Sequence, residues 1–142
     1  MTSRKKEYND AEQVPTHLSD SEVLYWLQNR EVDLAFLNRL KEYSEVTDDI
    51  LAIWLNISVR TLRNYRNPDN NIKAYVKEQA LLLMSLFVHG KEVFGTPARF
   101  NEWLNMENFY FDGRSPSSML NTISGIRFVN DRLHAIEYGD NV

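Results

Sequence analysis

The sequence predicts a mainly α-helical chain, built from an N-terminal helical domain, a long connecting helix and a small helical C-terminal module. Apolar residues recur three and four positions apart along most of the 142 residues, which is the spacing of an amphipathic helix. Ser, Thr or Asp stands directly before several of these stretches, where such residues cap helices. No stretch alternates as a half-buried strand does. We therefore expect a flexible arm at 1–16, a helical domain at 17–70, a connecting helix at 71–95 and a C-terminal module at 96–142.

The first two helices and the connecting helix follow from this spacing. Leu18–Arg30 carries an apolar stripe and can be capped by Ser19 or Asp20. Asp33–Tyr43 repeats the pattern. A longer helix is expected from about Ile72 to His89 or beyond, because its apolar residues keep the helical period over that length.

The segment Asp48–Arg66 is typical of a helix-turn-helix. Thr47 caps the first helix, and Ala52 is the small residue needed where two helices cross. Asn56 tolerates the left-handed backbone of the turn, and Ser58 caps the second helix, which ends before the turn sequence "NPDN". Apolar residues occupy the expected buried positions at Leu51, Leu55, Ile57, Leu62 and Tyr65.

A helical projection of the second helix separates its arginines. Arg60, Thr61, Arg63 and Asn64 form a continuous outward face, whereas Arg66 falls on the buried side and must meet another partner. Arg and Asn side chains at the start of such a helix can reach base edges or phosphates. The candidate DNA-binding residues are Ser58, Arg60, Thr61, Arg63, Asn64 and Arg66.

The charge distribution agrees with this interpretation but does not require it. The formal net charge is -4, yet by count the segment 11–58 carries about -6 and the segment 59–97 about +3. A basic helix on an acidic body fits a contact with nucleic acid. A purely structural pair of helices with solvated arginines remains the alternative.

The C-terminal module shows a different set of signals. Thr96-Pro97 and Ser115-Pro116 each place a cap residue before a proline, which opens a helix. Between them "FYFDGRSP" reads as a loop, with a short extended piece expected at Phe109–Phe111. The last helix is expected from about Gly125 to Tyr138, and Gly139 ends it.

The C-terminal module contains four motifs in the order "FGTPARFNEWL", "FDGRSPSSML", "NTISG" and "IEYG". In this order they resemble the toxin-binding domain of the Xre/MbcA/ParS antitoxins. Upstream, "SVRTLRNYR" looks like the Ser-x-Arg-Thr-Leu signature of that family, and the resemblance covers roughly 30–140. Asp112-Gly113 stands where the family usually has Gly-Gly, and Gly139 is followed by Asp140 rather than by an apolar residue. The matching positions are Phe94-Gly95, Trp103-Leu104, Gly113, Pro116, Leu120, Thr122, Gly125 and Gly139.

The resemblance implies the antitoxin of a type II toxin–antitoxin system in the bacterial cytoplasm. Its C-terminal module would cover the NAD pocket of an NAD-consuming toxin of the RES type or an ADP-ribosyltransferase-like relative. Its N-terminal, Xre-like helix-turn-helix domain would dimerise, bind operator DNA and repress its own operon. Exposed aromatic residues often mark protein interfaces, and an arginine beside them is a further common feature of such interfaces. The candidate toxin-binding residues are Phe109, Tyr110, Phe111, Asp112, Gly113, Arg114, Tyr138 and Gly139.

Two further functions stay open at this point. The chain could be a stand-alone helix-turn-helix transcriptional regulator whose C-terminal module binds another protein. Alternatively, the helix-turn-helix could serve only dimerisation while the C-terminal module still binds a toxin.

Residues for catalysis, a cofactor or a metal are not apparent. The chain has no cysteine, no P-loop and no Gly-rich dinucleotide fingerprint, and its apolar runs are too short to span a membrane. His89 with Glu92, and His134 with Glu137, each share a helix face, but neither spacing is that of a zinc hydrolase. We interpret both pairs as surface residues, and we expect neither an enzyme nor a membrane protein.

Overall fold

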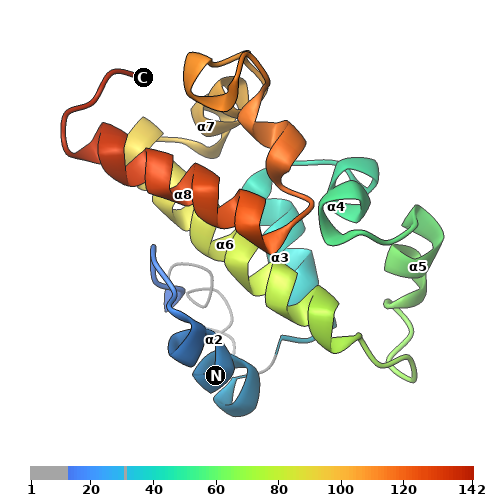
Figure 1. The fold of residues 1–142 in the computed structure, drawn as a ribbon. Helices are drawn as coiled ribbons and strands as arrows, with labels where there is room; N and C mark the ends of the chain where they lie inside the picture. Colours follow the sequence, from blue (N-terminus) through green and yellow to red (C-terminus); the bar gives the residue numbers. More distant parts are fainter. Residues whose placement is uncertain (1–12, 31) are drawn as a thin grey trace.

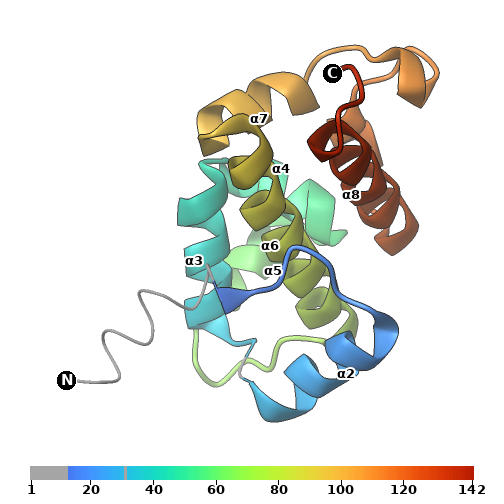
Figure 2. The ribbon, with the colours of Figure 1, turned by 90° about the vertical axis from the view of Figure 1, so that its left-hand side faces the viewer.

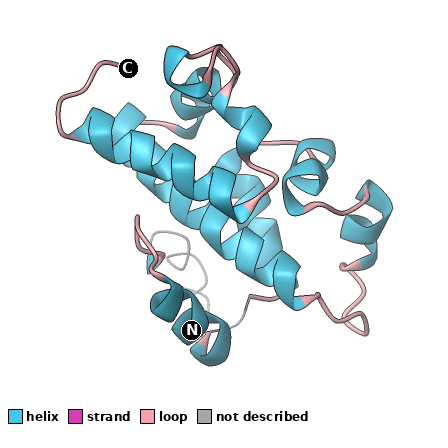
Figure 3. Cartoon of the chain, in the orientation of Figure 1, coloured by secondary structure: helices cyan, strands magenta, loops and turns pink. Residues whose placement is uncertain are grey.

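The computed structural model describes residues 13–30 and 32–142, and the regular structure of these residues is entirely helical (Figure 3). The mainly α prediction is therefore confirmed. Residues 1–12 of the expected arm lie outside the described residues, whereas Val14 is already buried. The elements are α2 (Asp20–Asn29), α3 (Leu34–Ser44), α4 (Asp48–Leu55), α5 (Val59–Asn64), α6 (Ala74–Phe94), α7 (Pro97–Leu104), the 3₁₀ helices η1 (Phe109–Phe111) and η2 (Pro116–Met119), and α8 (Ile123–Glu137).

Side-chain caps fix where most of these helices begin. In each case the side-chain oxygen accepts a hydrogen bond from the backbone N–H three residues later. Because Thr122 caps α8, that helix begins at Ile123, earlier than the expected Gly125. These caps are Ser19, Asp33, Thr47, Ser58, Thr96 and Thr122.

The expected extended piece at Phe109–Phe111 is wrong, because these residues form the 3₁₀ helix η1. The side chain of Asn108 accepts a hydrogen bond from the backbone N–H of Tyr110, which closes the first turn. Asp112 then adopts a left-handed conformation with φ of 55° and ends the helix. Local capping, which needs no neighbouring strand, thus decides the conformation of this segment.

Helix α6 lies at the centre of the molecule rather than merely connecting two parts. Residues 79–90 are all buried. Figure 1 shows α8 lying along α6, and Figure 2 shows α6 between α3 and α8. Helices α2, α4 and α7 also pack against it. The two expected modules therefore share one core helix, and the boundaries at 70 and 95 stay a prediction.

A chain of aromatic contacts runs through this core from α4 to α8. Its central step is an edge-to-face contact between Phe87 of α6 and Phe100 of α7, with ring centroids 5.0 Å apart. The successive pairs are Trp54–Phe87, Phe87–Phe100, Phe100–Trp103, Trp103–Phe111 and Phe111–Phe128.

Gly90 allows the Phe100 ring to lie directly against the backbone of α6. A Cβ atom at this position would lie 2.3 Å from Cδ2 of Phe100, well inside van der Waals contact. Phe100 is fully buried and cannot move into solvent. The close approach of α7 to α6 therefore requires glycine at position 90.

Asp48, the first residue of α4, ties three helices of the N-terminal part together. Its carboxylate lies 2.8 Å from Nζ of Lys41 in α3 and 3.1 Å from Nη2 of Arg66, just beyond α5. The hydrogen bond from Lys41, supported by the positive charge of Arg66, holds the pKa of Asp48 below its usual value.

We predict that Gly90→Ala lowers the free energy of unfolding by about 1–3 kcal/mol, because the added methyl group overpacks the core against Phe100. This loss outweighs the better helix propensity of alanine, which is worth about 1 kcal/mol. Urea denaturation measures the change. Phe100→Leu makes room, so the double variant should lose less stability than the two single changes summed. If the stability losses of the two single variants simply added in the double variant, the contact between position 90 and Phe100 would be contradicted.

We predict that Asp48→Asn lowers the free energy of unfolding by about 1 kcal/mol at neutral pH. Because the pKa of Asp48 is lowered by folding, its contribution is complete above the unfolded value of about 3.9 and is lost as the pH falls through the folded value. The difference between wild type and variant in urea denaturation should therefore vanish in acid.

The control is Asp49→Asn, which changes the neighbouring acidic residue in the same first turn of α4. A loss of stability in Asp48→Asn that persists unchanged in acid would argue against the ion pairs.

Candidate functional site

Helices α4 and α5 have the arrangement that the sequence indicated for a helix-turn-helix. Asn56 has φ of 56° and ψ of 41°, the left-handed conformation required for the tight turn. Ile57 is half-buried, and the remaining expected core positions are buried. These are Leu51, Ala52, Leu55, Leu62 and Tyr65.

The outward face of α5 is open to solvent. Arg60, Arg63 and Asn64 are exposed, and Thr61 is half-buried. The hydroxyl of Ser58 accepts a hydrogen bond from the backbone N–H of Thr61 at 3.0 Å and lies 3.0 Å from its hydroxyl. Ser58 and Thr61 thus stabilise the start of α5, while Arg60, Arg63 and Asn64 are the side chains free to reach a ligand.

Arg66 stands apart from the other candidate DNA-binding residues. Helix α5 ends at Asn64, and the Arg66 side chain turns back to the Asp48 carboxylate. The helical projection placed Arg66 on the buried side, but the residue is exposed; the different partner expected for it is the Asp48 carboxylate. The first role of Arg66 in the structure is to hold the two helices of the pair together.

At the other end of the molecule, the candidate toxin-binding residues differ in exposure. Phe109 is 89% exposed and Tyr138 is 86% exposed, while Tyr110 is about half exposed. Phe111 is only 2% exposed and packs between Trp103 and Phe128, so its assignment to the contact surface is wrong. Its ring belongs to the core because η1 turns it inward.

The remaining candidates lie in turns beside these aromatic residues. Asp112 and Gly113 both have positive φ, at 55° and 78°, and form the sharp turn after η1. Arg114 is exposed next to that turn. Gly139, with φ of 106°, ends α8 as expected.

Arg132 brings the two candidate toxin-binding segments together, although no pattern in the sequence indicated this residue. Its guanidinium carbon lies 3.4 Å from the centroid of the Tyr110 ring. Its Nη1 lies 3.0 Å from the carboxylate of Asp140, and its Nη2 donates a hydrogen bond to the carbonyl oxygen of Asn141. The η1 loop and the C-terminal tail are thus joined through one buried cation.

Phe128, one helical turn before Arg132 on α8, also contacts η1. Its ring meets that of Phe111 edge to face at 5.3 Å, yet half of the side chain remains exposed. Phe128 lies off the apolar stripe of α8 formed by Ile126, Val129 and Leu133. An aromatic residue off such a stripe is the signal that could have identified it.

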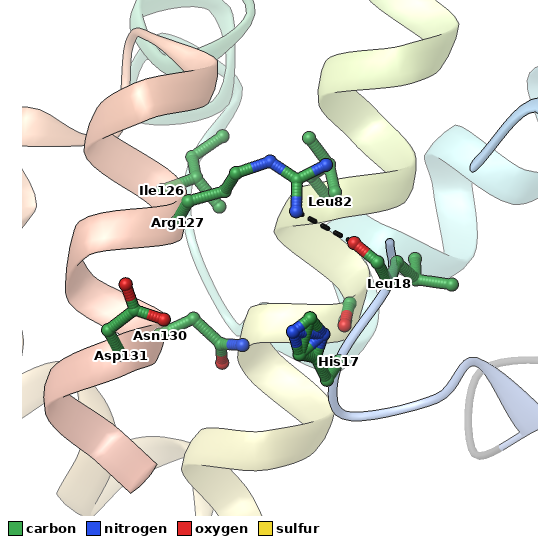
Figure 4. Close-up of a pocket in the computed structure, with 8 residues that line it drawn as sticks. His17, Leu18, Leu82, Ile126, Arg127, Asn130 and Asp131 are labelled. Carbon is green, nitrogen blue, oxygen red and sulfur yellow. Dashed lines mark hydrogen bonds between the residues drawn. The ribbon is translucent and has the colours of Figure 1, made fainter. Parts of the chain in front are cut away.

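Residues 13–19, which we call the strap, cross α6 and α8 on a different face of the molecule. Arg127 donates a hydrogen bond to the carbonyl oxygen of Leu18 at 2.7 Å (Figure 4). Asn130 donates one to the carbonyl oxygen of Thr16 at 3.0 Å. A pocket of about 240 Å³ lies between the strap and the two helices. The main polar side chains that line this pocket already form hydrogen bonds with the strap, so we assign the pocket no ligand.

Beside this pocket, His89 is fully buried and its Nε2 lies 3.3 Å from Oε1 of Glu137, so its expected place on the surface beside Glu92 is wrong. His89, His134 and Glu137 each offer one potential metal-binding atom, and these atoms lie within 4.8 Å of one another. Burial first, and then the electrostatic effect of the neighbouring His89, lowers the pKa of His134 below its usual value. In the described part of the chain, no helix is both long enough and apolar enough to cross a membrane.

Comparison with known proteins agrees with the motif order. No curated protein matches the chain. Residues 89–139 match the family described as the antitoxin Xre/MbcA/ParS C-terminal toxin-binding domain. The matched region begins inside α6 and includes α7, η1, η2 and α8, so it contains the exposed aromatic residues, Arg132 and the turn at Gly113. The C-terminal part of this chain is therefore similar to that toxin-binding domain, which supports membership of the chain in the Xre/MbcA/ParS antitoxin family.

Proposed function

We propose that this protein is the antitoxin of a type II toxin–antitoxin system that neutralises its toxin by steric blockade. The match of residues 89–139 to a toxin-binding domain carries the proposal. The toxin is an NAD-consuming enzyme of the RES type or an ADP-ribosyltransferase-like relative, encoded beside the antitoxin. Binding alone accounts for neutralisation, so the antitoxin needs no catalytic group or cofactor of its own.

The exposed aromatic side chains suggest how the toxin is held. Phe109 and Tyr138 project almost fully into solvent, and large exposed aromatic residues are common anchors at protein interfaces. Tyr110 lies beside Phe109 and is held from behind by Arg132, which lowers the entropy lost on binding. A rigid surface of this kind can cover the mouth of a substrate pocket without entering it.

The second part of the proposal is autorepression through α4 and α5. Arg60, Arg63 and Asn64 offer two cations and an amide on one exposed face. A homodimer would present two such helices to the two halves of a palindromic operator. In Figure 1, α5 lies at the side of the molecule opposite the C-terminus, so DNA and toxin would not compete for space.

We predict that Arg60→Ala combined with Arg63→Ala weakens binding to the promoter DNA of its own operon at least about tenfold. The double variant should still neutralise the toxin, because α5 lies outside the toxin-binding domain. A gel shift at fixed salt concentration measures the first property, and growth rescue measures the second. Arg99→Ala, an exposed arginine on α7, is the matched control. Unchanged DNA affinity in the double variant would remove α5 from the DNA contact.

We predict that Phe109→Ala combined with Tyr138→Ala abolishes growth rescue when the toxin is co-expressed, and lowers toxin affinity at least about tenfold. The fold should persist, because both side chains are exposed. Calorimetry with a catalytically inactive toxin measures the affinity. Tyr25→Ala, an exposed aromatic on α2, is the matched control. Full rescue by the double variant would contradict this contact surface, while failure of the wild-type protein to bind any neighbouring gene product would contradict the antitoxin proposal.

A further inference from the structure

Three side chains from α6 and α8 converge at a point close to the strap. His89 is fully buried, and its Nε2 lies 3.3 Å from Oε1 of Glu137. Nδ1 of His134 lies 3.6 Å from the same carboxylate oxygen. The centroids of the two imidazole rings are 4.4 Å apart. Two imidazoles therefore face one carboxylate oxygen.

The hydrogen bonds of Asn130 determine which nitrogen of His89 carries the proton. Nδ2 of Asn130 donates to the carbonyl oxygen of Thr16, so its Oδ1 must be the atom that faces Nδ1 of His89 at 2.7 Å. An amide oxygen can only accept, and Nδ1 of His89 is therefore protonated. In a neutral imidazole, Nε2 then presents a lone pair to the Glu137 carboxylate. Two acceptors at 3.3 Å repel each other unless a cation lies between them.

We propose that His89, His134 and Glu137 form a binding site for Zn²⁺. Zinc–nitrogen and zinc–oxygen bonds of about 2.0–2.1 Å place tetrahedral ligands about 3.3–3.4 Å apart. The two distances to Oε1 of Glu137, 3.3 Å and 3.6 Å, are close to that separation. Asn130 has the role of an outer-shell partner, because it fixes the tautomer and orientation of the ligating His89.

Three protein ligands leave one tetrahedral position for water or for a further side chain. His134 and Glu137 are both partly exposed, so the site opens to solvent on that side. His17, on the strap, has its ring centroid 5.9 Å from that of His134 and is a candidate for this position. The bound metal would join α6, the strap and the C-terminal end of α8. Helix α8 ends at Glu137, immediately before Tyr138.

A proton shared between His89 and Glu137 is the competing explanation. It would relieve the repulsion between these two groups, but it would not account for a second imidazole at the same oxygen. A divalent cation uses both imidazoles at once, which is why we favour it.

The test uses the untagged full-length chain after removal of metal with a chelator, so that no histidine tag competes. Calorimetric titration with Zn²⁺ should show one site per chain with a dissociation constant in the micromolar range or below. Free Zn²⁺ at about one hundred times that constant should shift the folding equilibrium about a hundredfold and raise the melting temperature by several degrees. Bound Co²⁺ should give the visible absorption bands of a tetrahedral site.

Glu137→Gln and His134→Gln should each weaken Zn²⁺ binding at least about tenfold. Glu92→Gln, an exposed residue three positions after His89 on α6, is the matched control and should bind as the wild type does. The melting temperatures of the metal-free variants verify that they fold.

The proposal is overturned if the wild-type chain does not bind Zn²⁺, or if Glu137→Gln binds it equally well. A doubly protonated His89 in the NMR spectrum at neutral pH, unchanged by added Zn²⁺, would assign the site to a proton instead. All of these measurements use the isolated chain, so they do not depend on the toxin or the operator.

Discussion

The burial of α6 is the constraint on which the rest of the structure depends. Residues 79–90 have no exposed face, so every side of this helix must be covered by another element. Burial of that much apolar surface is the main source of stability in a domain of this size. Helices from the N-terminal part cover some sides and helices from the C-terminal part cover the others, which gives the helix-turn-helix and the toxin-binding domain a common core.

Polar contacts then fix the position of the outer helices. Gln79 of α6 donates a hydrogen bond to the carbonyl oxygen of Trp54, and Asn101 of α7 donates one to that of Ser44. Asn56, in the turn of the helix-turn-helix, reaches the carbonyl oxygen of Asn121 before α8. Because hydrogen bonds are directional, these contacts select one arrangement among the many that would bury similar area. The two candidate binding surfaces are therefore held in a fixed relation.

Much of the local structure could be predicted from the sequence. Caps such as Thr47 and Ser58 and the left-handed turn at Asn56 act over three or four residues, and the structure confirms them. The helical projection expected a separate partner for Arg66, which the structure shows to be Asp48, but Arg66 is exposed and not buried as the projection indicated. The prediction failed at Phe109–Phe111, where an aromatic run suggested an extended loop, but the Asn108 side chain closes a 3₁₀ turn.

The sequence by itself determined most of the α-helices and their caps, the turn chemistry and the order of motifs in the C-terminal domain, because these depend mainly on neighbours within one turn. Only the tertiary structure decided which side chains meet across helices. Arg132 joins η1 to the C-terminal tail, and Phe111 leaves the surface for the core. His89 faces Glu137, 48 positions away, instead of Glu92 on its own helix. These partners lie on different elements, and the packing around α6, not the spacing along the chain, sets the distance between them.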